Sequence, residues 1–535
     1  MKKIIIGILV TTMLSSVLFT GCGEKKTVDG KNEERYTVTV GYPKAEDTWC
    51  EDEYFKYITD KVGLDIEFTA LSADTAAEKA RIWISSGGMP DMVFTDFLMD
   101  EYLQYGEQGV VKTMPADIEE KYPNLGFSMA MTRILSELKE AGNGEIYGLV
   151  RPLDHYRYYV EDFRAAYNEG KDMAEMMLEQ PYLYIDTCGF AYRKDWAKQL
   201  GIETDYIMEY DDFIDMALKF KEADLGGVGS KNTIGVAVSY TEAPNIFITA
   251  FNSSYKYFHK DETGKYICGL LEDSTTDGVV AFIDAYRKGV LANDFYTQKS
   301  KDLNSLFCSG RSGIIFPKSD PTSLRTLRSD FAKANPGVNP DEAIGVCWIK
   351  SPDGKVHGRE SGNHNRVWYF NPELSDEKLD KILQLGDYVS SPEGGKQIRY
   401  GVPGVDYDEN YNIISDLANK AIADKYPSAT FFATFLNPQF TMPNMTDPLA
   451  YEESKKLDDA KKSEDLSLLT WDAKRDFYVA EDYVKFNAKY EVNSMFAELV
   501  VSDGDPRELW NKKREEIAEA AKSVEDNMNK ALLGK

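Results

Sequence analysis

The sequence has 535 residues, of which 43% are hydrophobic, so it is long enough to form two or more globular units of roughly 100 to 200 residues each. Asp and Glu total 89 against 62 Lys and Arg, which gives a net charge of −27. Such a surface repels phosphate backbones and anionic headgroups, which argues against nucleic acid as a partner and favours neutral or cationic ligands.

The N-terminus has the layout of an export signal. Two lysines precede an apolar run at residues 4–19, and Gly21 and Cys22 follow it. The run is shorter than the about 20 apolar residues that a membrane-spanning helix needs, so a permanent transmembrane helix is the weaker interpretation. Residues 23–35 are polar and cannot bury a core, so we expect them to form a flexible tether.

The cysteine after this signal resembles the lipobox cysteine of bacterial lipoproteins, whose thiol is acylated. The resemblance implies that residues 1–21 are a lipoprotein signal peptide and that Cys22 carries a palmitate-type anchor. Residues 22–35 would then tether the body to the cell membrane, on its extracellular side or in a periplasm. An ordinary cleaved signal is the alternative.

The first part of the body alternates strand and helix patterns. Residues 36–41 and 64–68 alternate as strands do, and residues 92–94 are a third short apolar run. Between them, residues 53–62 and 75–86 have helical spacing and end at glycines. A βαβαβ unit of this kind predicts a parallel sheet covered by helices, with ligands at the carboxyl ends of its strands.

The C-terminus predicts one long helix. Asp505 and Pro506 suit a helix start, and Glu508 completes a capping-box-like pattern. The helix should run to about Leu533, and an apolar stripe follows one face of it. We interpret the stripe as core packing, with a partner interface as the alternative; its members are Ile517, Ala521, Val524, Met528 and Leu532.

Six short motifs follow one another along the chain, at residues 86–94 (SGGMPDMVF), 144–149 (GEIYGL), 191–202 (AYRKDW to LGI), 286–291 (YRKGVL), 307–313 (FCSGRSG) and 401–407 (GVPGVDY). In this order they resemble the extracellular solute-binding proteins, family 1, that serve carbohydrate ABC transporters. The length of the chain is similar to that of the large-lipoprotein branch of this family.

This resemblance implies a two-lobed α/β fold of the periplasmic-binding-protein type, class II, with a hinge between the lobes. We expect the crossings near residues 150–153, 315–318 and 390–393, where prolines occur. The first lobe would then hold residues 36–150 and 315–390, and the second lobe residues 151–314 and 391–535.

The resemblance also implies a function. The protein would act as a monomer that captures a carbohydrate, by default an oligosaccharide, between its lobes and delivers it to the permease subunits of an ABC importer. It would be held at the membrane by its lipid anchor. Neither catalysis nor a cofactor is expected of such a receptor.

A sugar presents hydroxyl groups and apolar ring faces, which aromatic, carboxylate, amide and guanidinium side chains bind. We expect such side chains just beyond predicted strands, including those at residues 234–238, 344–347 and 367–370. This rule gives the candidates Trp49, Asp91, Asp96, Tyr240, Glu242, Trp348, Asn363, His364 and Arg366. The motif at residues 191–202 adds Arg193.

Several of these candidates have a structural alternative. Tryptophans such as Trp49, Trp348 and Trp368 lie in a core more often than in a cleft. Asp91 follows a proline and could cap that turn. Arg193 could equally hold a structural ion pair.

No metal site is expected. Large relatives carry a calcium loop of alternating Asp residues, but residues 222–232 hold only two carboxylates. With Cys22 acylated, the other cysteines form an odd set without a close pair, so neither disulfides nor a zinc cluster is implied. They are Cys50, Cys188, Cys268, Cys308 and Cys347.

Other functions stay open. An exported glycoside hydrolase needs two carboxylates at a set separation, which a sequence with 89 acidic residues cannot identify. The sequence has no H-E-x-x-H, G-x-S-x-G or P-loop motif to support other enzymes. A sensor or adhesin lipoprotein, or a receptor for a peptide or another polar solute, would share the fold.

Overall fold

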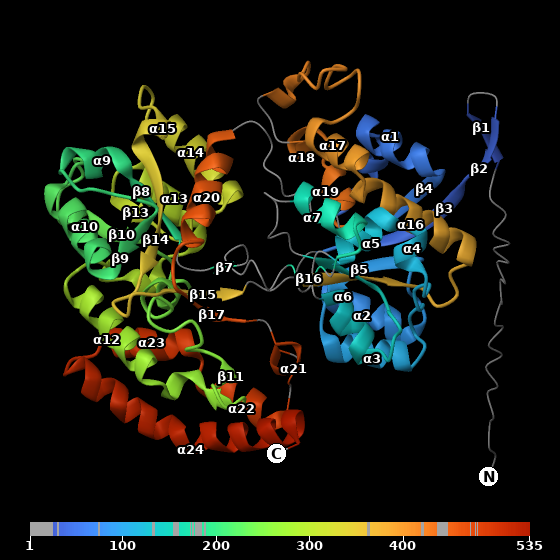
Figure 1. Ribbon diagram of the computed structural model, residues 1–535. Helices are drawn as coiled ribbons and strands as arrows, with labels where there is room; N and C mark the ends of the chain where they lie inside the picture. The colour runs from blue at the N-terminus through green and yellow to red at the C-terminus, as the bar shows by residue number, and fades with distance from the viewer. Residues whose placement is uncertain are drawn as a thin grey trace, which may run out of the picture.

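Two five-stranded sheets covered by helices form two lobes that lie side by side (Figure 1). The computed structural model describes residues 25–28, 31–72, 75–130, 134–152, 160–171, 173, 176, 185–186, 189–360, 364–418, 422–435, 448–470, 472–476, 478 and 480–534. The two-lobed α/β architecture expected from the motifs is therefore confirmed. Cys22 and the whole of the expected signal peptide lie outside the described residues.

The first sheet has the strand order β4-β3-β5-β16-β6. β3 pairs in parallel with β4 and β5, and α1 (Glu53–Val62) and α2 (Ala76–Ser86) connect them, so the predicted βαβαβ unit is confirmed. β16 comes from far along the chain and pairs antiparallel with β5 and β6. The strands are β3 (Tyr36–Pro43), β4 (Leu64–Leu71), β5 (Met92–Asp96), β6 (Leu149–Pro152) and β16 (His364–Phe370).

The core of the first lobe joins early and late parts of the chain. Asp52 begins α1, because its side chain accepts a hydrogen bond from the Phe55 amide. The buried face of α1 then meets α19 (Ala429–Phe432), with ring centroids 5.7 Å apart for Tyr54 and Phe432 and 5.5 Å apart for Phe55 and Phe432. Residues after 400 thus complete a lobe that begins at residue 36.

The second sheet has the order β10-β13-β8-β14-β9. β10, β13 and β14 run in one direction, and β8 lies antiparallel between β13 and β14. The strands are β8 (Gly189–Arg193), β9 (Ile207–Glu209), β10 (Ile234–Ala237), β13 (Ser312–Ile315) and β14 (Ile344–Lys350). The helices that pack in this lobe include α10 (Tyr210–Ala223), α12 (Asp273–Arg287), α14 (Pro321–Ala334), α20 (Pro448–Lys461) and α24 (Pro506–Leu533).

The long C-terminal helix α24 forms as predicted and lies along the bottom of the second lobe (Figure 1). The Asp505 carboxylate accepts a hydrogen bond from the Glu508 amide at 2.9 Å and caps the helix. The predicted stripe packs against α12 and the hydrophobic core, with Ile517, Ala521, Val524 and Met528 buried, so core packing is confirmed. Among the described residues, no helix is both long and apolar enough to cross a bilayer.

The structure corrects the expected lobe boundaries. α7 (Val160–Asn168) still belongs to the first lobe, because Arg164 donates a hydrogen bond to the Ser390 carbonyl at 2.9 Å. β13 and β14 are both in the second sheet, so the crossing expected at residues 315–318 is wrong. α17 (Pro392–Tyr400) packs on α16 (Asp376–Ser390) of the first lobe, so the crossing expected near residue 390 is wrong as well.

A small third sheet of order β17-β15-β7 contains β15, after which the chain passes from the second lobe to the first. Its strands are β7 (Ile185–Asp186), β15 (Val356–Glu360) and β17 (Leu466–Leu469). β15 leads directly into β16 of the first lobe. The prolines that suggested other joints have local roles: Pro152 ends β6, and Pro392 opens α17 behind the Ser391 cap.

Candidate functional site

Three charged side chains lie at one edge of the first sheet, where β16, the strand that follows β15 in the chain, begins. β5 ends at Asp96, β6 contains Arg151, and β16 places Arg366 opposite both of them in register. Directly opposed residues on neighbouring strands project from the same face of a sheet. Arg366 Nε lies 3.4 Å from Asp96 Oδ1, so the structure brings two of the predicted candidates together.

Arg151 was missed by sequence reasoning, because only the strand pairing makes it a neighbour of Arg366. Its side chain is half-buried, and among the described residues no carboxylate lies within ion-pair distance of it. Burial lowers the pKa of the Arg151 guanidinium, the buried Tyr42 phenol opposes this, and the like charge of Arg366 lowers it further. Among the described residues of this edge, the Asp96 carboxylate therefore pairs with Arg366, and Arg151 lies opposite Arg366 without an ion pair.

The second lobe and the crossing strand β15 supply a polar and aromatic network. Glu242, which follows β10 as predicted, accepts a hydrogen bond from Asn245 Nδ2 at 2.6 Å. Arg359 of β15 donates to the Tyr257 hydroxyl at 2.9 Å and reaches Asn245 Oδ1 at 3.5 Å. The Arg475 guanidinium lies 5.4 Å from the Tyr257 ring centroid. Apart from Glu242, no residue of this network was a candidate, because no local pattern marks these positions.

Tyr240 lies beside Glu242 but contacts a helix of its own lobe. Its hydroxyl is 3.2 Å from the Ser494 hydroxyl on α23 (Val492–Val500), and its amide donates to the Gln298 carbonyl. The side chain is half-buried. Tyr240 therefore borders the network without joining it.

The two candidate tryptophans lie in the cores. Trp49 is 8% exposed, and its ring centroid lies 5.9 Å from that of Tyr42 and 5.8 Å from that of Phe68. Trp348 is 2% exposed within β14, with the Lys461 ammonium 4.4 Å above its ring. The structure thus favours the alternative of core packing for both, because tertiary contacts bury positions that sequence alone cannot place.

Asp91 and Arg193 also have structural partners. The Asp91 carboxylate accepts hydrogen bonds from the amide and hydroxyl of Thr39 at 2.9 and 3.1 Å and lies 3.2 Å from the Lys378 ammonium. Arg193 donates to Asp195 at 2.8 Å, and its guanidinium lies over the rings of two buried aromatic residues, Trp196 and Phe331.

Two further candidates fall wholly or partly outside the described residues. Asn363 lies outside the described residues. His364 is the first residue of β16, where it pairs with Pro152, and its side chain is outside the described part. As the first residue of β16, His364 lies at the same edge of the first sheet as Arg366.

The loop at residues 222–232 is held together by one carboxylate. Asp224 accepts hydrogen bonds from the Val228 and Gly229 amides at 3.2 and 2.9 Å and from the Thr233 hydroxyl at 2.9 Å. Among the described residues, no group of three or more His, Cys, Asp or Glu side chains is arranged to hold a metal ion.

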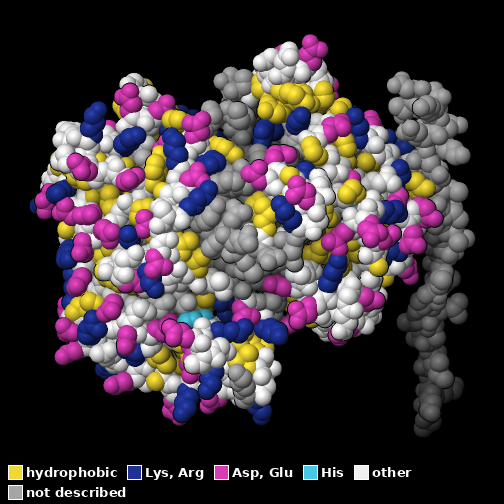
Figure 2. Space-filling view, in the orientation of Figure 1, with side chains coloured by type: hydrophobic (Ala, Val, Ile, Leu, Met, Phe, Trp, Pro, Cys, Tyr) yellow, Lys and Arg dark blue, Asp and Glu magenta, His cyan; other side chains and the backbone are white. Residues whose placement is uncertain are grey.

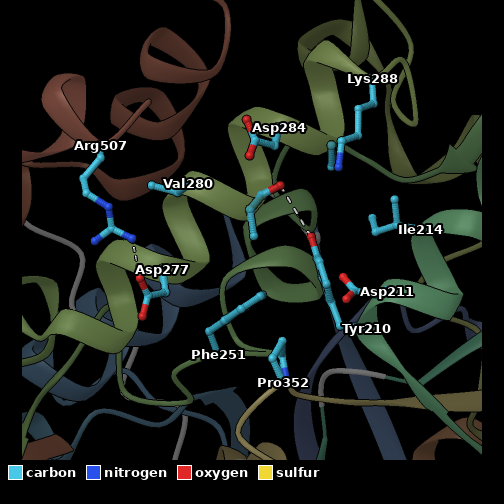
Figure 3. Close-up of a pocket in the computed structure, with 12 residues that line it drawn as sticks. Tyr210, Asp211, Ile214, Phe251, Asp277, Val280, Asp284, Lys288, Pro352 and Arg507 are labelled. Carbon is cyan, nitrogen blue, oxygen red and sulfur yellow. Dashed lines mark hydrogen bonds and ion pairs between the residues drawn. The ribbon is translucent and has the colours of Figure 1, made fainter. Parts of the chain in front are cut away.

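A surface pocket of about 270 Å³ lies on the second lobe alone, between α10 and α12 (Figure 3). Tyr210 and Phe251 form its apolar part, with ring centroids 4.9 Å apart. At its rim Arg507 pairs with Asp277 at 2.7 Å. Because one lobe supplies the whole lining, movement between the lobes would leave this pocket unchanged.

Residues 140–396 match the family model of bacterial extracellular solute-binding proteins. This part of the chain, 257 of its 535 residues, is therefore similar to that family. A sequence relative is the polygalacturonan/rhamnogalacturonan-binding protein YtcQ of Bacillus subtilis, 22% identical over 368 residues, which are 67% of this chain and 64% of YtcQ. Another is the fructooligosaccharide ABC transporter substrate-binding protein FusA of Streptococcus pneumoniae, 24% identical over 241 residues, 42% of this chain and 40% of FusA. The matches thus span less than two thirds of each of these solute-binding relatives.

Solved structures share the fold of this chain over nearly its whole length. FusA of S. pneumoniae in complex with kestose has a TM-score of 0.58 at 17% identity and covers 93% of this chain and 100% of its own. A solute-binding protein from Bifidobacterium longum infantis associated with an HMO-binding ABC transporter has a TM-score of 0.58 at 15% identity, with 93% and 96% covered. The alginate-binding protein AlgQ2 has a TM-score of 0.55 at 16% identity, with 92% and 96% covered.

Proposed function

We propose that this protein is the substrate-binding lipoprotein of an ABC importer, which captures an oligosaccharide between its lobes and delivers it to a membrane permease. The observation that carries the proposal is the family match over residues 140–396, together with the carbohydrate ligands named for its relatives. A receptor of this kind binds its ligand without chemical change.

The candidate site lies where a two-lobed receptor needs it. Asp96, Arg151 and Arg366 lie on the first lobe, and Glu242 with Asn245 lies on the second. The crossing strand β15 lies between these two sets, so rotation about the crossings would bring both onto one ligand. The planar groups would then bind sugar hydroxyls, and Tyr257 would face a sugar ring.

The test is a thermal-shift screen of residues 23–535 against oligosaccharides, monosaccharides, peptides and polyamines. A ligand that binds only the folded protein stabilises it, by about 2.7 kcal/mol at a hundredfold excess over Kd, and this stabilisation raises Tm. We expect a shift with one class of oligosaccharide and recovery of the sugar intact. Cleavage of the sugar would support a hydrolase instead, and a shift with peptides alone would overturn the ligand class.

Lipidation is tested separately in the full-length protein. We expect Cys22→Ser to abolish labelling with palmitate and to move the protein out of the membrane fraction, because no other thiol follows the export signal directly. Cys50→Ser is the matched control and should keep both the label and the location. Labelled, membrane-bound Cys22→Ser protein would contradict the anchor.

A further inference from the structure

We infer that the solute is an acidic oligosaccharide, one that contains uronic acid residues; the inference rests on the proposed function and names its substrate class. The observation behind it is the opposed pair of arginines, Arg151 and Arg366, at the edge of the first sheet. The relatives named above include receptors for neutral fructooligosaccharides and for an acidic pectic polymer, so the charge of the site has to decide between these classes.

The positive charge of the arginine pair contrasts with the net negative charge of the whole molecule. Acidic side chains outnumber basic ones by 89 to 62, and they are spread over the visible face of both lobes (Figure 2). Among the described residues at the sheet edge the balance is reversed, with two guanidinium groups, Arg151 and Arg366, beside the carboxylate of Asp96. At the crossing, Arg359 and Arg475 lie around Tyr257, and Glu242 accepts a hydrogen bond from Asn245.

Without a ligand, repulsion between Arg151 and Arg366 lowers the stability of the folded protein. Residues directly opposed in an antiparallel sheet have Cα atoms roughly 4.5 to 5.5 Å apart, and like charges in such a position destabilise the sheet. Arginine cannot relieve this by losing its proton, since its guanidinium stays charged in proteins. A carboxylate placed between Arg151 and Arg366 would remove the repulsion and accept paired hydrogen bonds from either group.

The two arginine groups lie within reach of one oligosaccharide. Five peptide steps separate Arg359 on the crossing strand from His364 at the start of β16, so their Cα atoms lie at most about 18 Å apart. Arg366 follows two residues later in the same strand. A chain of sugar rings that stacks on Tyr257 can therefore extend a carboxylate to the arginine pair.

Matched ligands test the inference. Binding of trimers of galacturonate, mannuronate and guluronate to residues 23–535 would be measured by calorimetry, each beside its methyl ester, which keeps the rings but loses the charge. We expect one acid to bind at least tenfold more tightly than its ester. Added salt should weaken binding of the acid and leave binding of the ester unchanged.

Matched variants test the assignment to the arginines. Arg151→Gln should weaken binding of the acid about tenfold or more and leave the ligand-free Tm equal or higher, because it removes the repulsion. Arg507→Gln, which removes one positive charge from the surface of α24, should bind like the wild type. Arg366→Gln serves the same purpose if Arg151→Gln fails to fold.

The outcomes separate the two claims. Equal binding of acid and ester, or binding of neutral sugars alone, would overturn the acidic ligand while the carbohydrate receptor stands. Unchanged binding of the acid by both arginine variants would overturn the role of the pair. If no sugar of any kind binds, the proposed function itself fails.

Discussion

Replacing Trp348 by alanine is expected to lower the free energy of unfolding of the ligand-free protein by about 3 to 5 kcal/mol, the usual cost of removing a buried tryptophan. Trp348 is 2% exposed on β14, which lies between β8 and β9 in the second sheet. Its ring also covers Lys461, which is itself 1% exposed and paired with Asp458 at 2.7 Å. The substitution therefore leaves a cavity beside a buried ammonium group.

The measurement is chemical denaturation in the absence of ligand. Trp348→Phe is the matched control and should cost clearly less, because it keeps an aromatic ring under the Lys461 ammonium. An unchanged denaturation midpoint for Trp348→Ala, together with loss of sugar binding, would show instead that the ring faces the ligand.

Replacing Asp406 by alanine is expected to cost about 3 to 5 kcal/mol, because it breaks a buried ion pair from one side. The Asp406 side chain is 0% exposed and lies 2.5 Å from the Lys425 ammonium. It also accepts hydrogen bonds from the Val402 amide at 2.8 Å and the Tyr426 hydroxyl at 2.9 Å. Without the carboxylate, the turn after α17 loses the group that holds it to α18 (Ile422–Lys425).

The same lysine offers a matched control. Asp416 lies 3.4 Å from Lys425 but is 50% exposed, so Asp416→Ala should change the unfolding free energy little, as exposed pairs do. Denaturation of both variants checks this contrast. Equal effects would mean that burial of Asp406 adds nothing to the strength of its pairing.

Asp406 also predicts how stability depends on pH. Burial raises the pKa of the Asp406 carboxyl, but hydrogen bonds from Lys425 and the Val402 amide outweigh it, so the pKa lies below its usual value. The folded state is then favoured above the unfolded pKa of about 3.9, and this contribution is lost as pH falls below that value. In Asp406→Ala this part of the acid sensitivity should disappear.

Local patterns were sufficient where neighbouring residues decide the structure. The helix predicted at residues 53–62 has these bounds, since Asp52 caps it and Gly63 adopts φ of 71° after it. The strands around it pair in parallel as expected, and the C-terminal helix starts behind its Asp505 cap. Part of the candidate site follows from the same logic, because Asp96 is the last residue of β5 and Glu242 lies five residues after the end of β10.

The sequence by itself therefore determined the resemblance to solute-binding proteins, the alternation of strands and helices and the apolar faces, because motifs, caps and periodicity are properties of adjacent residues. Only the tertiary structure decided which segments share a lobe and which side chains meet. Arg151 and Arg366 are 215 positions apart, and Trp348 is buried by Lys461 from a distant helix. Strand order brings such residues together through long-range pairing and packing, which local sequence does not specify.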